Sequence, residues 1–396
     1  MNRSEFRVVG LLLLLGCSDA GPPPGPATLG VDVRAAEDAR GAILQVVEEK
    51  GPAARAGLQP GDLIQAIDGK PVEAPCDLDR ALLDRAPGET VKVSIRRGRE
   101  SREETLVLAN ALDLYGEACN GGRVSSCRQL GVLYLQGRKV PADLARAAQI
   151  FEQACQGGSA DACADLGILL LEGNGVAADE ARARALFRQA CDDGSAAGCA
   201  HFAYLYATGR GVPQDDARAV AFYRKACDEG DAAGCYNLGV HFGDARGTPG
   251  NQSLALAAYT RGCEMGSSLA CTNLGFQYER GLGTQADVQR AVTVYTRACE
   301  GTRCEPGDPM GCFNLGVLYR DGLGVATDKA RAASLFERGC EGGNALGCAN
   351  LADLLAAGDG VPQDEKRAEE LFLRACEGGH QRSCEHIGRL PEKPSP

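Results

Sequence analysis

The residues with the clearest potential for chemistry are nineteen cysteines, most of which recur in pairs. The stretch ACQGGSADAC, residues 154–163, holds one such pair, Cys155 and Cys163. Paired cysteines can bind a metal, form a redox couple or join in a disulfide. Zinc sites use shorter spacings and usually include His, and redox pairs typically read Cys-x-x-Cys beside a βαβ unit. The sequence contains no Cys-x-x-Cys, so we predict no metal and no cofactor.

The remaining residue types form no recognisable catalytic motif. The chain contains no Gly-x-Ser-x-Gly, no Ser-x-x-Lys and no Lys-Thr-Gly. A Ser-His-Asp triad has no obvious site either, because every histidine lies in a repeated context in the second half. The four histidines are His201, His241, His380 and His386. We predict that the protein is not an enzyme and assign no catalytic residue.

The composition limits the partners and the compartment. The formal net charge is -11 and the isoelectric point is near 5.1. Nucleic-acid binding needs a cluster of Lys and Arg against the phosphates, so we exclude it. Nineteen cysteines favour an oxidising compartment, because reducing compartments do not maintain disulfides.

A sequence pattern that repeats over residues 110–390 indicates which secondary-structure elements position the cysteines. The first cysteines of successive pairs are 36 residues apart, except for one interval of 41 that contains the five-residue insertion RCEPG at 303–307. Such a period indicates a stack of similar helical units. An aromatic residue four positions before each first cysteine shares its helix face, and we interpret this column as core. The aromatic residues are Tyr115, Phe151, Phe187, Tyr223, Tyr259, Tyr295, Phe336 and Phe372.

This period, the helix sequence NLGVLY and the corner GxGV resemble Sel1-like repeats, and the cysteine spacing resembles their cysteine-rich secreted subfamily. The resemblance implies an all-α, right-handed α/α solenoid of about seven repeats that is related to tetratricopeptide arrays and binds proteins. It also implies one disulfide in each repeat. The implied pairs are Cys119–Cys127, Cys155–Cys163, Cys191–Cys199, Cys227–Cys235, Cys263–Cys271, Cys299–Cys312, Cys340–Cys348 and Cys376–Cys384.

The geometry of a helix hairpin is compatible with these pairs, since it brings the end of one helix close to the start of the next. Closing a loop of about nine residues contributes roughly 2.6 kcal/mol through chain entropy. The repeat leaves Cys76 and Cys304 over. Cys304 lies in the insertion and could compete for Cys299 or Cys312, and we keep Cys299–Cys312 as the default pair.

Residues 29–109 have a different, β-rich pattern. The string GPAARAGLQPGDLIQAIDGKPV closely resembles the core of bacterial PDZ domains. The resemblance implies a small α+β domain that captures a peptide carboxyl terminus or strand at a sheet edge, with the carboxylate at the loop Thr28–Val31. The implied peptide-binding residues are Leu29, Gly30, Val31, Val33, Leu78, Ala81 and Leu82. Leu78 and Leu82, one helical turn apart, can equally well be core residues.

The amino terminus predicts membrane anchoring. Arg3 and Arg7 precede an apolar run, Val8 to Leu15, that is too short to span a bilayer. The run ends in LLGC, which resembles a bacterial lipobox and implies removal of residues 1–16 and acylation of Cys17. Residues 17–28 are a Pro/Gly-rich tether, and residues 391–396 are a short tail. We expect a bacterial cell envelope protein that is held at the outer membrane and faces the periplasm.

Four asparagines follow the second cysteine of their repeats by two positions. They are Asn237, Asn273, Asn314 and Asn350. Such a column of amides could bind an extended peptide, or each asparagine could tie its own repeat to the next.

The combined organisation predicts a multidomain, disulfide-stapled adaptor that binds protein or peptide partners through the PDZ domain and the repeat surface. The cysteine-rich subfamily also implies an alternative, a weak penicillin-binding or β-lactamase-like enzyme.

Overall fold

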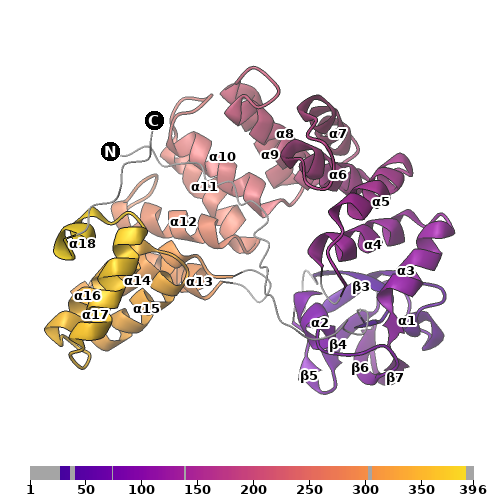
Figure 1. Cartoon of the computed structure of the whole chain (residues 1–396), viewed down its shortest axis with the longest axis horizontal. Helices are drawn as coiled ribbons and strands as arrows, with labels where there is room; N and C mark the ends of the chain where they lie inside the picture. Colours follow the sequence, from indigo (N-terminus) through magenta and orange to yellow (C-terminus); the bar gives the residue numbers. More distant parts are fainter. Residues whose placement is uncertain (1–26, 36–40, 74, 138–139, 302–305, 389–396) are drawn as a thin grey trace. The chain divides into compact units, whose positions relative to one another are not determined.

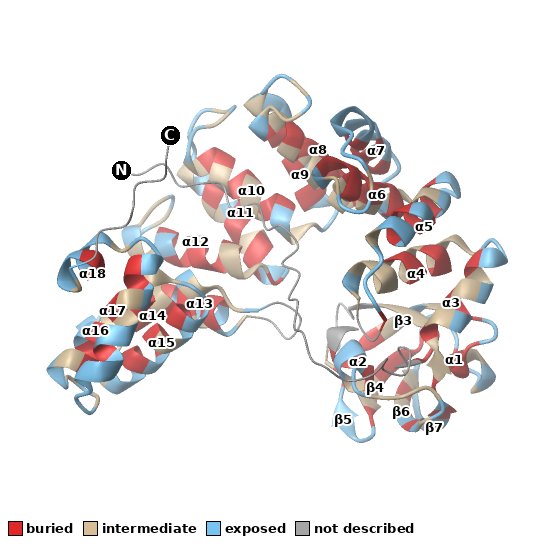
Figure 2. Ribbon diagram, viewed as in Figure 1, coloured by how far each residue is buried: buried red, intermediate tan, exposed pale blue. Residues whose placement is uncertain are grey.

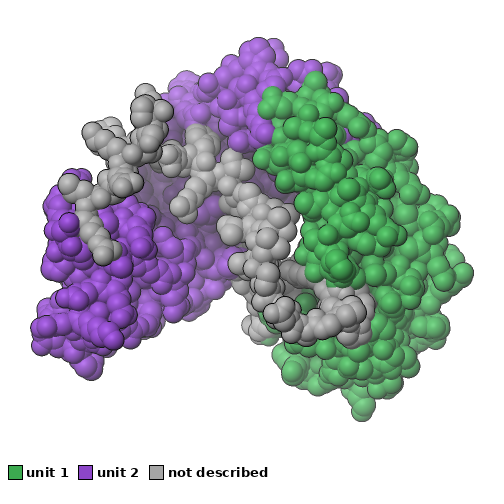
Figure 3. All heavy atoms as spheres, viewed as in Figure 1, with its two compact units in different colours: residues 1–183 green, residues 184–396 purple. Residues whose placement is uncertain are grey.

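The structure is a computed structural model that describes residues 27–35, 41–73, 75–137, 140–301 and 306–388. The chain forms two compact units, Met1–Ala183 and Arg184–Pro396, which Figure 3 colours separately. The predicted signal peptide, Cys17, most of the tether, Cys304 and the carboxyl-terminal tail lie outside the described residues. None of the described helices is both long and apolar enough to span a membrane.

The first unit begins with a small antiparallel β domain (Figure 1). Its sheet has the strand order β2-β3-β4-β6-β7, and β5 pairs with β4, so β2 and β7 are the edges. The ribbon formed by β1 and β8 joins the two ends of the domain. The strands are β1 Ala27–Thr28, β2 Val31–Ala35, β3 Ala42–Val47, β4 Leu63–Ile67, β5 Lys70–Pro71, β6 Thr90–Arg97, β7 Glu100–Val107 and β8 Ala109–Asn110, and the helices are α1 Pro52–Arg55 and α2 Pro75–Leu82.

The side chains of the strands alternate between a buried and an exposed face of the sheet. In β6, Val91, Val93 and Ile95 are buried, while the residues between them are exposed or half-buried. The edge strand β7 begins with the charged sequence ESREE, which discourages pairing with a second sheet. One face of the sheet therefore supplies the core of the domain.

Antiparallel helix pairs follow, as Figure 1 shows. Within the second unit, each even-numbered helix from α8 to α14 also contacts the next even-numbered helix, so these helices form a continuous layer. The helices are α3 Ala111–Asn120, α4 Val124–Gln136, α5 Leu144–Gln156, α6 Ala160–Glu172, α7 Glu180–Asp192, α8 Ala196–Thr208, α9 Asp216–Asp228, α10 Ala232–Gly243, α11 Gln252–Glu264, α12 Ser268–Arg280, α13 Val288–Glu300, α14 Pro309–Asp321, α15 Lys329–Glu341, α16 Ala345–Ala357, α17 Glu365–Glu377 and α18 Gln381–His386.

Local sequence signals start and stop these helices. Ser159, for example, accepts a hydrogen bond from the backbone N–H of Ala162 and so caps α6. The same helix ends at Gly173, which has a φ of 71° in the left-handed region that glycine adopts without strain. The other side-chain caps of this kind are Asn110, Asp143, Asp179, Ser195, Asp215, Asp231, Asn251, Ser267, Asp287, Asp308, Asp328, Asn344 and Asp364.

The predicted aromatic column is buried, and Figure 2 shows the buried residues on the helix faces that meet their neighbours. Tyr295 is fully buried, and its ring lies over Gly275 of the preceding helix pair. A Cβ at position 275 would come within 2.6 Å of that ring, so a glycine is needed for this close helix approach. The chain thus has the predicted organisation, a β-rich domain followed by a helical repeat array.

Candidate peptide-binding site

The edge strand β2 and the helix α2 flank one side of the β domain. Val31 and Val33 of β2 and Ala81 of α2 are partly buried against the core cluster of the domain. Leu78 and Leu82 are 4% and 8% exposed and belong to that core. The structure therefore brings all the predicted residues to one place, but only the first three of these side chains have appreciable exposed surface.

The loop before β2 is the predicted position of a ligand carboxylate. Leu29 is fully buried, and Gly30 has a φ of 71°. The carbonyl of Leu29 accepts a hydrogen bond from the N–H of Ala53 at 3.1 Å, and that of Gly30 accepts one from the N–H of Glu48 at 2.9 Å. These bonds fix the backbone of the loop against the rest of the domain. The N–H of Gly30 donates to Oγ1 of Thr28 at 3.0 Å.

Sequence reasoning missed that the first helix of the array contacts this loop. Helix α3 follows directly on β8, which pairs with β1. The hydroxyl oxygens of Thr28 and Tyr115 are 3.1 Å apart and buried. Burial raises the pKa of Tyr115 to about 12, so its hydroxyl is protonated at neutral pH. The sequence marked Tyr115 only as the first member of the aromatic column.

A second contact with the helical array passes through Glu48, which is 4% exposed. Its carboxylate accepts hydrogen bonds from Ser126 at 2.5 Å and from Arg123 at 2.7 Å. Both donors lie at the start of α4. A buried carboxylate is stable only with such partners, so this cluster fixes the β domain to the first helix pair.

The eight disulfides of the described residues are the eight pairs predicted from the sequence. Their Cα atoms are 4.3–4.7 Å apart, and seven of the pairs are eight residues apart in the sequence. Cys299–Cys312 spans thirteen positions and accommodates the insertion. The side chain of Cys76, like Cys304, is outside the described part of the chain.

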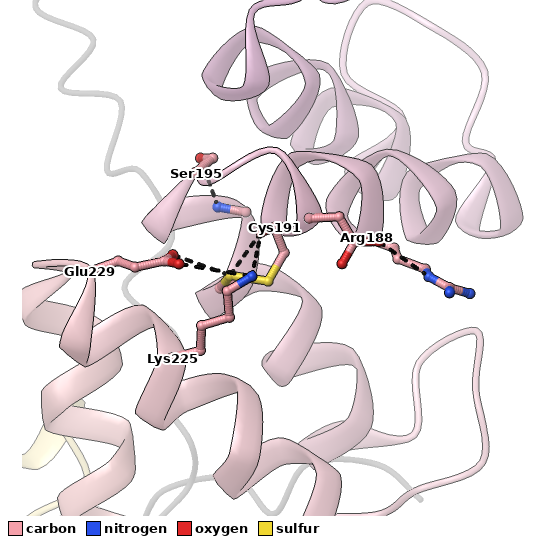
Figure 4. Close-up of a disulfide and its surroundings, with 8 residues drawn as sticks. Arg188, Cys191, Ser195, Lys225 and Glu229 are labelled. Atoms are coloured by element: carbon pink, nitrogen blue, oxygen red, sulfur yellow. Dashed lines mark hydrogen bonds and ion pairs between the residues drawn. A yellow bond between two sulfur atoms is a disulfide. The ribbon is translucent and has the colours of Figure 1, made fainter.

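A column of cations, which the sequence reasoning also missed, lies beside the disulfides. Figure 4 shows Lys225 beside Cys191, and its ammonium group donates to the Cys191 carbonyl at 2.7 Å. This carbonyl is at the carboxyl-terminal end of α7, where a positive charge is favourable. A cation stands two positions before the first cysteine in each later pair as well. Arg261 and Arg338 donate to the first-cysteine carbonyl of the preceding pair. Arg297 and Arg374 donate to the carbonyl of the residue after that cysteine, Glu264 and Glu341.

The four asparagines of the predicted solenoid face lie half-buried on the consecutive even-numbered helices α10, α12, α14 and α16. The side chain of Asn273 lies near the hydroxyls of Tyr236 and Tyr259, where it partly offsets the rise in their pKa that burial causes. Asn350 accepts from Arg320 at 2.5 Å and donates to the Leu346 carbonyl at 2.8 Å. Part of the hydrogen-bonding capacity of these amides is thus used inside the array.

The second unit also contains an open pocket of about 740 Å³ near α7 and α8. Three arginines line it, and each already has a partner, which for Arg188 is an ion pair with Asp192. Arg184 donates to the Gly211 carbonyl at 2.9 Å, and Arg218 lies over the ring of Tyr206 at 5.5 Å. Within the described residues, no group of three or more His, Cys, Asp or Glu side chains could hold a metal ion.

Comparison with protein families separates the β domain from the helical repeats. The PDZ domain family matches residues 27–108. The Sel1 repeat family matches seven successive segments over residues 124–302 and 309–380. These matches confirm the predicted PDZ region and the predicted solenoid of about seven repeats.

Curated relatives match over a short stretch only. A probable periplasmic serine endoprotease, DegP-like, of Brucella suis is 37% identical over 70 residues, which are 18% of this chain and 14% of that protein. The magnetosome formation protease MamE of Paramagnetospirillum magneticum is 35% identical over 72 residues, which are 18% of this chain and 10% of that protein. The chain therefore spans less than a sixth of the length of these relatives, and the protease matches fall on the PDZ part.

Solved structures match the repeat part. A protective antigen of uropathogenic Escherichia coli is 27% identical with a TM-score of 0.56, and the match covers 70% of this chain and 59% of that one. A Sel1 repeat protein from Oxalobacter formigenes is 26% identical with a TM-score of 0.55, and the match covers 70% of this chain and 79% of that one. Both support the helical repeat fold.

Proposed function

Because the chain belongs to the Sel1 repeat family and carries a PDZ domain ahead of its repeats, we propose that it is a non-catalytic adaptor. Its PDZ domain captures the carboxyl terminus or an extended strand of one protein, and its repeats bind a second. The observation that carries the proposal is the edge strand β2, which has a sheet neighbour on one side only and faces α2 across partly buried apolar side chains.

The peptide arm of the proposal follows from the chemistry of a sheet edge. An added peptide strand pairs with the backbone of β2, and its side chains contact Val31, Val33 and Ala81. Leu78, Leu82 and Leu29 form the apolar floor beneath them. A peptide with an apolar terminal residue and a free carboxylate suits this site.

The repeat arm uses the layer of even-numbered helices. An asparagine amide has two donor hydrogens and an acceptor oxygen. The contacts that Asn273 and Asn350 make within the array therefore leave hydrogen-bonding groups of these amides for a partner. We assign the face around Asn237, Asn273, Asn314 and Asn350 as the surface for a second partner.

The location of the protein is part of the same proposal. Eight disulfides in the described residues suit an oxidising compartment, and the Brucella relative is named as periplasmic. We assign Cys17 as the lipid attachment site and the outer membrane as the site of anchoring. Metabolic labelling with radioactive palmitate should mark the intact protein and not Cys17→Ser. Equal labelling of both proteins would contradict the anchor.

Fluorescence anisotropy tests the peptide arm on the full chain. Decapeptides that end in Val, Leu, Ile or Phe are made with a free carboxylate and with a carboxamide. We expect the free carboxylate to bind more tightly, and Val33→Glu on β2 to weaken binding about tenfold, which is about 1.4 kcal/mol. Val107→Glu on the opposite edge strand β7 is the matched control and should bind like the natural protein. Equal effects of both substitutions would place the peptide elsewhere.

The repeat arm is tested by crosslinking the protein to its partners in the cell envelope. Asn273→Ala together with Asn314→Ala should remove partners that Val33→Glu retains. If the double asparagine variant has a lower melting temperature but captures the same partners, the amides of Asn273 and Asn314 are structural.

A further inference from the structure

The Gly30 N–H is one of the donors that a ligand carboxylate would meet in the loop before β2. It already donates to Oγ1 of Thr28, two residues earlier, at 3.0 Å. A backbone N–H makes one strong hydrogen bond at a time. A carboxylate that uses this donor must therefore displace the threonine hydroxyl.

Thr28 is held in place by the first helix of the repeat array. Its hydroxyl oxygen lies 3.1 Å from that of Tyr115 on α3. Its backbone pairs with Ala109, the first residue of β8, which leads into the same helix. Both side chains are less than a tenth exposed, so water competes little for this hydrogen bond.

Two further contacts join the loop to the helices. A Cβ on Gly30 would lie 2.7 Å from Cδ2 of Leu114, so α3 packs directly against the loop backbone. The Gly30 carbonyl accepts from the N–H of Glu48, whose carboxylate binds Ser126 and Arg123 of the first helix pair. A shift of the loop is thus opposed by side chains from both α3 and α4.

We infer that the peptide site is a composite of the PDZ domain and the first helix pair, in which Tyr115 holds the Thr28 hydroxyl as an internal cap on Gly30. The inference rests on the proposed peptide capture and adds a positioning residue, Tyr115, from outside the PDZ domain. Its ligand is a peptide with a free terminal carboxylate, because that group takes over the Gly30 N–H.

The arrangement couples the peptide site to the first helix of the array. A carboxylate that displaces Thr28 weakens its contact with Tyr115, and a partner that moves α3 changes the strength of the cap. Linkage requires these effects on the two binding free energies to be reciprocal.

The test measures the affinity of the full chain for the same fluorescein-labelled decapeptides. Thr28→Val removes the cap and keeps the side-chain shape, and we expect about fivefold tighter binding of free-carboxylate peptides, as the loss of one competing hydrogen bond predicts. Tyr115→Phe should tighten binding about twofold, because Thr28 then loses its anchor. Thr28→Ser keeps the hydroxyl and should bind like the natural protein.

The double variant Thr28→Val/Tyr115→Phe separates the cap from a general loss of structure. It leaves neither hydroxyl unpaired, and we expect its affinity to equal that of Thr28→Val, because Tyr115 acts only through Thr28. Carboxamide peptides, which lack the competing charge, should gain less than twofold from any of these changes. Melting temperatures identify any variant that does not fold.

The outcomes distinguish the two proposals. If no free-carboxylate peptide binds the natural protein or any variant, peptide capture itself is wrong, and the inference fails with it. If the natural protein binds and Thr28→Val binds equally or less tightly, or if Tyr115→Phe acts equally with and without Thr28, only the internal cap is overturned.

Discussion

Arg97 holds both carboxylate oxygens of Asp62, with Nε and Nη2 each donating at 2.6 Å. Asp62 is 1% exposed and also accepts the N–H of Gln59 at 2.9 Å. The guanidinium continues to the Gly57 carbonyl at 2.9 Å. One ion pair therefore closes the turn AGLQPGD, which gave the domain its resemblance to PDZ domains.

The Asp62 pair predicts an acid-dependent contribution to stability. The hydrogen bond from Arg97 holds the pKa of Asp62 below its usual value of 3.8. The contribution is therefore complete above about pH 4 and is lost as the pH falls through the lower folded-state pKa. We expect Asp62→Asn to lower the melting temperature of the PDZ domain by about 5 °C at neutral pH, and less in acid. Calorimetry at a series of pH values measures this difference.

The control for Asp62 is Glu103, whose ion pair with Lys92 is more than half exposed. Glu103→Gln should change the melting temperature little, because exposed ion pairs contribute little. Equal effects at the two positions would show that burial is not the cause.

The insertion in one repeat should leave its disulfide unchanged. Because Cys299 and Cys312 are joined, Cys304→Ser should give the same peptide map as the natural protein under non-reducing conditions. Replacing Cys299 and Cys312 together by Ser should lower the free energy of unfolding of that repeat by about 3 kcal/mol. Mass spectrometry that found Cys304 bonded to either residue would contradict the assigned pair.

A half-buried histidine should make the second unit sensitive to acid. Burial against Phe187 lowers the pKa of His201 to about 4, whereas a histidine in the unfolded chain titrates near 6.5. As the pH falls from 6.5 towards 4, the unfolded chain binds a proton that the folded chain excludes, so stability decreases.

His201→Asn tests this effect with the residue that other repeats have at this position. Between pH 6.5 and 4, we expect the free energy of unfolding of the variant to fall less steeply than that of the natural protein. The difference in slope should be up to about 1.4 kcal/mol for each pH unit. Urea unfolding at about pH 7 and about pH 5 measures the slope. Parallel stability curves for the two proteins would contradict the assignment.

The cation column should stabilise each repeat modestly. Arg261→Gln removes a hydrogen bond to the carboxyl-terminal carbonyl of α9 and should cost about 0.5–1 kcal/mol. The equivalent residues Gln153 and Gln189 show that glutamine is acceptable at this position. Arg188→Gln, which loses only an exposed ion pair with Asp192, is the control and should be nearly neutral in urea unfolding. An equal loss at both positions would exclude a specific role for the column.

The repeats were predictable because each repeat contains the local sequence signals that start, end and pack its helices. A cap such as Ser159, a terminal glycine such as Gly173 and the aromatic Phe151 recur with one period, so every repeat supports the interpretation of the others. The same redundancy identified the cysteine pairs.

The peptide site was predictable only in outline. The spacing of Leu78 and Leu82 fits both a groove wall and a core, and their burial became known only from the packing of α2. The contact between Thr28 and Tyr115 joins residues 87 positions apart. A single sequence carries no signal for such a pair, because neither residue departs from its own local pattern.

Each disulfide of the described chain closes within one helix hairpin, and none of these eight links a hairpin to the next. The staples therefore resist unravelling of a hairpin but bear no tension between hairpins. If the two ends of the array are pulled apart, the load passes through the main chain at the corners and through side-chain packing, so the array should lengthen by separation of intact hairpins. Mechanically, the repeats form a chain of rigid links with compliant joints.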